Sequence, residues 1–146
     1  MFSASAISQT SSATVNSADQ IAALESALRQ QAKSGNGTAS AYLVQYPQYY
    51  AQLIVRTSSG EVEIHQRFDE IMIVLDGEAE VLCGGTPQNP HTIRPGELRA
   101  PAAVGGMPTR MMKGTVIHIP QDTPHHVVIP AEGYVAYLDI KIAHPQ

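Results

Sequence analysis

The feature that most constrains this chain is a series of short apolar runs, separated by turn residues, that fills the sequence from Tyr42 onward. The runs are rich in Val, Ile, Leu and Tyr, residues that favour strands. The predicted strands are 51–57, 61–65, 71–76, 79–83, 97–100, 110–112, 115–119, 126–129 and 134–142. Because no helical pattern lies between them, the series predicts an all-β sandwich or closed barrel.

Glycine-containing pairs punctuate the predicted strands. Asp76-Gly77 lies between two apolar runs and predicts a tight hairpin. The stretch from Gly84 to Pro108 is long and rich in Gly and Pro. We therefore expect it to form a loop excursion that carries one short strand.

One helix is predicted before the strands begin. Ser17 can cap it, and Gln20 stands at the reciprocal position of a capping box. Three apolar residues then recur at helical spacing: Ile21, Leu24 and Leu28. Lys33 and Gly35 mark the end, so the pattern predicts a helix over 18–33.

The chain is expected to divide into three parts. Residues 1–17 form a flexible N-terminal arm, 18–35 contain the helix, and 36–146 form the barrel. The arm is uncharged and lacks the basic start and apolar run of a signal peptide. Both the cytoplasm and, for a mature exported form, the periplasm or exterior stay open as locations.

The composition excludes several functional classes. Net charge is −4, and no run of Lys or Arg occurs, which argues against nucleic-acid binding. No apolar run approaches the roughly 20 residues that a membrane span needs. The single cysteine, Cys83, excludes an internal disulfide and a CxxC metal motif.

Chemistry-bearing residues gather in two segments. In the first, Glu63, His65 and Arg67 alternate along a predicted strand and so share one face, and Glu70 opens the next run. In the second, Pro120 and Pro124 bracket a tight turn that His125 follows directly. These prolines fix the backbone and pre-position the imidazole.

Two imidazoles and a carboxylate are a common set of ligands for divalent metals. The predicted metal site comprises His65, Glu70 and His125, with Glu63 as a candidate fourth ligand. Zn, Mn, Fe and Ni are all compatible with it. Sequence spacing alone leaves open whether the four side chains converge.

At these residues the sequence resembles the cupin superfamily. The first cupin motif is Gly, five residues, His-x-His, three or four residues, Glu, six residues and Gly. Here His65 takes the second His, four residues lead to Glu70, and six more lead to Gly77.

The second cupin motif is Gly, five residues, Pro-x-Gly, two residues, His, three residues and Asn. Gly114, Pro120 and His125 match it, with Asp122 in the place of the second Gly. In its double glycines at 84–85 and 105–106, the sequence resembles a group of small bacterial single-domain cupins. The resemblance implies a cupin fold, that is, a double-stranded β-helix or jelly-roll barrel with one N-terminal helix, and a metal site at the motif residues.

The sequence departs from the first motif at a ligand position, because Glu63 stands where the family has its first His. Thr57 replaces the opening Gly, and Ile129 replaces the final Asn. If Glu63 binds, the site has two imidazoles and two carboxylates, which favours Mn, Fe or Zn over softer metals. If it does not bind, the site leaves positions open for water or ligand, and a barrel without metal is a third reading.

Three further residues are candidates for substrate contacts. Arg67 either holds a substrate carboxylate or forms a surface ion pair. Met72 shares the parity of Glu70 and either lines a cavity or packs in the core. His118 either lines the cavity or lies in the core or at an edge.

These observations predict a metal-binding cupin-type barrel that acts on a small organic molecule. Oxygenase, isomerase and lyase chemistry are all compatible with the fold, which does not choose among them. The alternative is a non-catalytic barrel that binds or senses a small ligand or a metal, which the missing motif His favours. Cupins usually pair through sheet edges, so a homodimer is expected.

Overall fold

The computed structural model describes residues 12–145. Within that range the chain forms one helix, α1 (Ala18–Ser34), followed by strands only. The strands are β1 (Thr38–Gln45), β2 (Tyr49–Arg56), β3 (Val62–His65), β4 (Phe68–Cys83), β5 (Thr86–Gln88), β6 (His91–Arg94), β7 (Glu97–Ala100), β8 (Ala102–Val104), β9 (Met107–Met112), β10 (Val116–Ile119), β11 (His125–Val128) and β12 (Val135–Ala143). Most of the predicted N-terminal arm, residues 1–11, lies outside the described residues.

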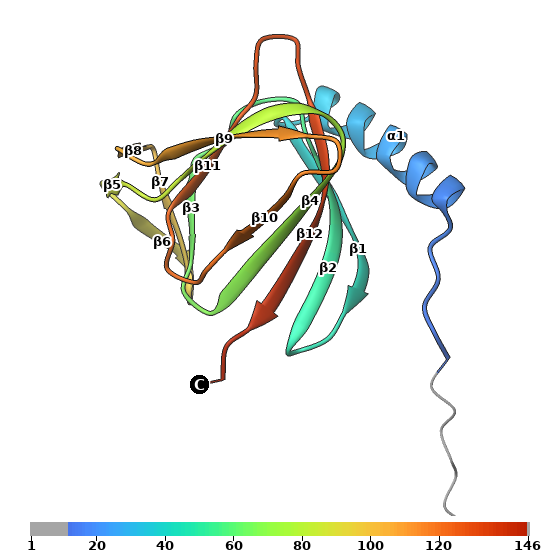
Figure 1. The fold of residues 1–146 in the computed structure, drawn as a ribbon, viewed down its shortest axis with the longest axis horizontal. Helices are drawn as coiled ribbons and strands as arrows, with labels where there is room; N and C mark the ends of the chain where they lie inside the picture. Colours follow the sequence, from blue (N-terminus) through green and yellow to red (C-terminus); the bar gives the residue numbers. More distant parts are fainter. Residues whose placement is uncertain (1–11, 146) are drawn as a thin grey trace, which may run out of the picture.

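The helix begins where the capping residues predict. Ser17 Oγ accepts a hydrogen bond from the Gln20 backbone N–H at 3.2 Å, and Gln20 Oε1 accepts one from the Ser17 N–H at 2.8 Å. The buried face of α1 carries Leu28 and Ala32, which pack on Leu53 and neighbouring apolar residues of the sheet. The predicted helix over 18–33 is therefore confirmed, and it covers the outer face of β1 and β2 (Figure 1).

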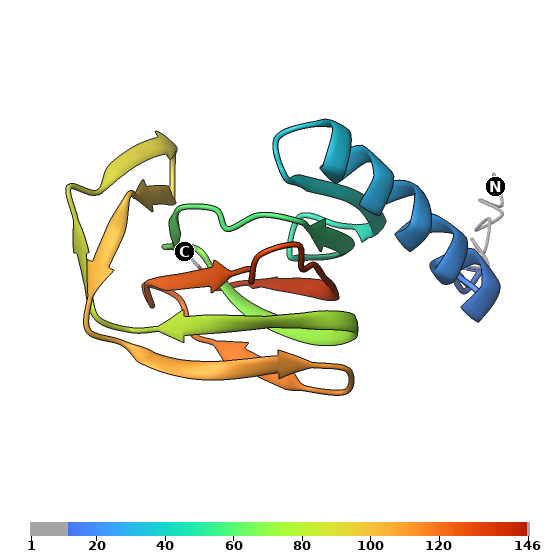
Figure 2. The same ribbon diagram turned by 90° about the horizontal axis from the view of Figure 1, so that it is seen from above.

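The strands form a curled antiparallel sheet in which β4 is the central element. Its first half pairs with β12 and β10, and its second half pairs with β9 and β11. The remaining neighbours extend the order to β1-β2-β12-β4-β11-β3-β7-β6. Figure 2 shows the helix at one side of the curled sheet and the short strands of residues 86–104 at the opposite side.

The predicted hairpin at Asp76-Gly77 is wrong, because β4 runs without a reversal from Phe68 to Cys83. Gly77 instead lies where β4 passes from one set of partners to the other. It has a positive φ of 74°, and a Cβ there would meet the Tyr134 carbonyl oxygen at 2.2 Å. The glycine is needed for a close approach between strands, not for a turn.

The prediction of a loop with one strand over 84–108 is also wrong. The strand at 97–100 is confirmed as β7, but β5, β6 and β8 accompany it. β6 pairs with β7, and β5 and β8 form a separate two-stranded sheet. β5, β6 and β8 have three or four residues each and are largely exposed, so they lack the buried alternation that marks longer strands. β1, an edge strand, was also missed.

The interior of the barrel is apolar at one end and polar at the other. The apolar end is a core of ten buried residues: Ile54, Met72, Val74, Ala79, Val81, Met111, Ile119, Val127, Val135 and Tyr137. Residues at i and i+2 of a strand share a face. Two residues along from Ile54, Met72 and Tyr137, the inward positions of the same strands carry charged or polar side chains. The strands that build the core thus also place the polar groups.

Replacing Gly77 with Ala is expected to destabilise the fold by about 2–5 kcal/mol. The new Cβ must both accept a left-handed φ and displace the Tyr134 carbonyl. Gly114→Ala is a matched control, because Gly114 has a φ of 89° but open space where the Cβ would lie. Urea unfolding of both variants checks this; an equal loss of about 1 kcal/mol in the two would contradict it.

Candidate metal centre

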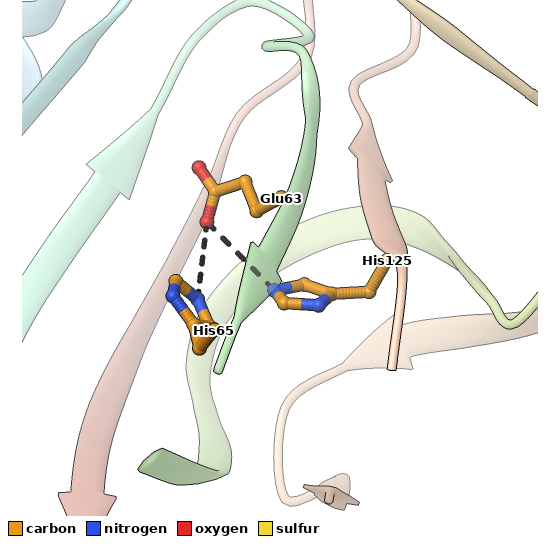
Figure 3. Close-up of side chains that lie close together, drawn as sticks. All are labelled: Glu63, His65 and His125. Carbon is orange, nitrogen blue, oxygen red and sulfur yellow. Dashed lines mark ion pairs between the residues drawn. The ribbon is translucent and has the colours of Figure 1, made fainter. Parts of the chain in front are cut away.

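Two imidazoles and a carboxylate meet where β3 and β11 lie side by side. Glu63 and His65 alternate on β3 and face the interior, and the sheet register places His125 of β11 opposite Glu63. Glu63 Oε2 lies 3.7 Å from His65 Nε2 and 3.8 Å from His125 Nε2 (Figure 3). Each of the three residues offers one ligand atom within 4.8 Å of the others, so the group can hold a metal ion.

Glu70 adds a second carboxylate from the start of β4. Its Oε2 lies 3.0 Å from His125 Nε2 and 3.3 Å from His65 Nε2, and the residue is 2% exposed. The structure therefore brings together all four residues of the predicted set, from three separate strands.

Both imidazoles are oriented by a contact at the far side of the ring. His65 Nδ1 lies 2.7 Å from Glu97 Oε2, and His125 Nδ1 lies 3.0 Å from the Thr123 carbonyl oxygen. Because these oxygens are acceptors, each Nδ1 carries a proton as donor, and in the neutral ring Nε2 presents its lone pair to the interior. Metal-binding histidines in proteins are usually held in this way.

The turn before His125 has the backbone conformation that the second motif requires, although a motif glycine is replaced. Asp122 stands where the motif has Gly and adopts a positive φ of 63°. The Asp122 N–H donates to the His65 carbonyl oxygen at 2.8 Å. The turn is thereby fixed to β3, which holds the two imidazole-bearing segments together.

When His125 is neutral, two buried acceptor atoms at the centre of the group have no hydrogen-bond donor within residues 12–145. They are Glu70 Oε2 and His125 Nε2, which lie 3.0 Å apart. An unpaired buried polar atom is costly, and a cation bound by both atoms would remove that cost. The donor set of imidazole nitrogens and carboxylate oxygens suits Zn, Mn, Fe or Ni. The residues present fit a divalent metal ion.

A buried lysine that the sequence analysis missed shares this centre. Lys141 of β12 is 3% exposed and stands opposite Glu70 in the sheet register. Its Nζ lies 2.7 Å from Glu70 Oε1, 3.0 Å from His65 Nε2 and 3.3 Å from Asp139 Oδ1. The signal was present in β12, where Asp139 and Lys141 continue the inward face that begins with Val135 and Tyr137.

Arginine side chains neutralise the outer part of the group. Arg56 Nη2 donates to Glu63 Oε1 at 2.7 Å, and its Nε donates to the Tyr137 hydroxyl at 2.9 Å. Arg99 Nη1 lies 3.4 Å from Glu97 Oε2. Glu63 thus uses one oxygen for Arg56 and keeps the other directed at the imidazoles.

Opposite charges hold the two central carboxylates ionised. Burial acts to raise the pKa of Glu63, but contact with His125 and the charge of Arg56 outweigh it and keep that pKa well below its usual range. Burial acts in the same sense on Glu70, and the charges of Lys141 and His125 again lower the pKa.

The negative charges of the site raise the pKa of a buried base. Burial lowers the pKa of His125, but the negative charges of Glu70 and Glu63 raise it to about 9. Asp139 is the exception among the acids, since burial and the charge of Glu70 raise its pKa to about 7.

A polar cavity of about 150 Å³ opens beside these residues. It is lined by Tyr50, Gln52, Ile54, Arg56, Glu63, His65, Glu70, Arg94, Glu97, Arg99, Asp139 and Lys141. The wall of the cavity is thus mostly charged.

The structure does not bring the three predicted substrate residues to this cavity. Arg67 lies beyond the end of β3, where the alternation with Glu63 and His65 stops, and its side chain lies against Gly96. Met72 packs in the apolar core. His118 is exposed, and its Nε2 lies 3.1 Å from Asp69 Oδ2. The basic side chains that line the cavity are Arg56, Arg94, Arg99 and Lys141.

No protein-family model and no curated protein matches the sequence. Solved structures do match. A cupin superfamily protein from Desulfitobacterium hafniense DCB-2 is 16% identical, over 75% of this chain and 81% of that one, with a TM-score of 0.53. The chain has the cupin fold. The motif-based expectation of an all-β cupin barrel is therefore confirmed.

Two other solved structures have similar scores. KdgF from Halomonas sp. is 18% identical over 76% of this chain and 84% of that one, with a TM-score of 0.55. The DMSP lyase DddQ from Ruegeria pomeroyi DSS-3 is 18% identical over 75% of this chain and 48% of that one, with a TM-score of 0.53.

Within residues 12–145, no helix is both long and apolar enough to cross a membrane.

Lys141→Met is expected to weaken the metal-free protein and to tighten its hold on metal. Without the ammonium, Glu70 and Asp139 lose their buried cation, at a cost of about 3–5 kcal/mol. A divalent ion no longer competes with that charge, so Zn²⁺ affinity rises by about tenfold or more. Thermal unfolding with and without Zn²⁺ measures both effects. The exposed Lys113→Met is the control, and a weaker Zn²⁺ affinity in Lys141→Met would contradict the expectation.

Stability of the metal-free protein is expected to fall as pH rises from about 6.5 to 9. The folded pKa of His125, about 9, exceeds its ordinary value of 6.5. Protonation of His125 therefore stabilises the fold fully below pH 6.5, and this contribution, roughly 1–3 kcal/mol, is lost as pH passes 9. Urea unfolding in EDTA across this range checks it. His125→Gln should flatten the profile, and an unchanged slope in that variant would refute the assignment.

Proposed function

We propose that this cupin barrel is a metal-dependent enzyme that acts on a small organic molecule. The observation that supports it best is that Glu70 Oε2 and His125 Nε2 lie 3.0 Å apart, buried beside a polar cavity, with no donor between them when His125 is neutral. Structural ion-pair clusters normally satisfy their buried atoms, whereas a ligand set for an ion leaves its donor atoms free.

His65, His125 and Glu70 would hold the ion, and Glu63 would add its Oε2 as fourth ligand. Glu63 is suited to this because Arg56 occupies only its Oε1. A bound divalent ion supplies Lewis acidity, which polarises a carbonyl or activates water or oxygen. Two carboxylates make the set harder than three imidazoles would, in favour of Mn, Fe or Zn.

Other residues of the wall would position the substrate and its protons. Glu97 fixes the ring of His65 through the 2.7 Å contact with Nδ1. Gln52 Nε2 donates to Asp139 Oδ2 at 2.7 Å, and Asp139 Oδ1 has only the looser 3.3 Å contact with Lys141 Nζ among the described residues. That oxygen is the wall atom placed to accept or release a proton during a reaction.

A non-catalytic barrel that binds or senses a small ligand is the second candidate. The substitution of Glu63 for the first motif His favours it, because a four-ligand site leaves fewer open positions. A turnover screen of small organic acids and carbonyl compounds, in air and under nitrogen, separates the two. Oxygenase, isomerase and lyase chemistry all remain within the proposal. One protein of similar fold, DddQ, is named as a DMSP lyase.

We also propose that the chain forms a homodimer. Light scattering at micromolar protein concentration tests it, with twice the 15.7 kDa chain mass expected.

Metal analysis tests the proposed site. Protein loaded with Zn²⁺ or Mn²⁺ and passed through a desalting column should retain about one ion per chain. His65→Ala and His125→Ala should each lower the affinity by about a hundredfold or more, and Glu97→Gln by about 10–100-fold, because it only orients His65.

The exposed residue His91 provides the control, since His91→Ala should retain the ion. Circular dichroism of each variant verifies that the barrel has folded. Equal retention in all variants, or none in the wild-type protein, would overturn the proposal.

A further inference from the structure

The cavity wall carries equal numbers of acidic and basic side chains. The acids are Glu63, Glu70, Glu97 and Asp139, and the bases are Arg56, Arg94, Arg99 and Lys141. With neutral imidazoles, the formal charges of the wall cancel. A divalent ion bound among them would leave the lined space with two positive charges in excess.

The inner bases are already engaged with acids of the wall. Arg56 contacts Glu63 at 2.7 Å, and Lys141 contacts Glu70 at the same distance. Arg99 has looser contacts, 3.4 Å to Glu97 and 3.9 Å to Glu63. Its Nη1 also donates to the Leu98 carbonyl oxygen at 2.8 Å, so the guanidinium is held in place but is less strongly paired with the acids of the wall.

Arg94 differs from the other three bases. It lies on β6 at the exposed side of the cavity, and within residues 12–145 it makes no ion pair. The register places it opposite Glu97, but Glu97 Oε2 already contacts His65 at 2.7 Å and Arg99 at 3.4 Å. Arg94 is thus a cation that lines the cavity without a partner among the described residues.

Building on the proposed function, we propose that the cavity binds a small organic acid whose carboxylate is held by Arg94 and Arg99. The opposite end of that molecule faces the imidazoles and carboxylates of the metal centre. A guanidinium fits a carboxylate with two parallel hydrogen bonds, and an anion offsets the excess positive charge of a metal-loaded wall.

The cavity has room for a short-chain acid. Its volume is about 150 Å³, enough for several water molecules. A dicarboxylate of four carbons is a suitable probe, because one carboxylate can face the metal centre while the other reaches the arginines.

Calorimetry with succinate and its half-amide, succinamate, tests the assignment on Zn²⁺-loaded protein. Succinamate keeps one carboxylate and replaces the other by a neutral group of the same shape. We expect succinate to bind about tenfold tighter or more, and Arg94→Gln and Arg99→Gln each to remove most of this preference. Arg94→Lys should retain part of it, because the charge stays and the planar fork is lost.

Arg110→Gln is the control variant, because Arg110 pairs with Glu78 on the exposed surface and its side chain is 66% exposed. It should preserve the full preference for succinate. Inorganic phosphate is a further arm, and binding of phosphate that is tighter than binding of succinate would overturn the assignment to a carboxylate.

The zinc content of every sample is measured separately. If the wild-type protein retains no metal, the proposed function fails and the acid site falls with it. If it retains about one Zn²⁺ per chain but does not prefer succinate, or keeps the preference in both Gln variants, the acid site alone is refuted.

Discussion

The structure depends on the mutual neutralisation of charges that the barrel buries on its inner face. An isolated carboxylate or ammonium in such a place would be strongly destabilising. Here the antiparallel register sets opposite charges beside one another: Lys141 stands across from Glu70, and Glu63 stands across from Arg99. The polar end of the barrel is therefore as specifically arranged as the apolar end.

This arrangement also makes the proposed metal and Lys141 competitors. The lysine Nζ contacts one oxygen of Glu70 and the Nε2 of His65, both of which an ion would use. His125 Nε2 and the second oxygen of Glu70 face each other at 3.0 Å and can share either a proton or an ion. The ammonium thus neutralises only part of the ligand set, so the site can remain folded without an ion and still favour one.

Local patterns in the sequence predicted much of this molecule. The capping box positioned the helix, and the two motifs selected His65, Glu70 and His125, which lie close together. The motifs succeed because each one describes a rigid local geometry: two alternating residues on a strand, or a turn with Asp122 in a left-handed conformation.

Features that depend on strand pairing escaped prediction. Lys141 lies 76 residues from His65, and only the register of β12 against β4 brings the two together. Strand alternation extended past His65 predicts that Arg67 shares the inward face, but β3 ends at His65. Asp76-Gly77 was interpreted as a hairpin because a close approach between strands and a tight turn both need a glycine with positive φ.

A crystal structure of the Mn²⁺- or Zn²⁺-loaded protein, with anomalous diffraction recorded at the metal edge, tests the central claim most directly. We expect one strong anomalous peak about 2.0–2.2 Å from Nε2 of His65 and of His125, with a Glu70 oxygen as a further ligand. A peak elsewhere, or imidazoles of residues 65 and 125 with no ion between them at saturating metal, would contradict it.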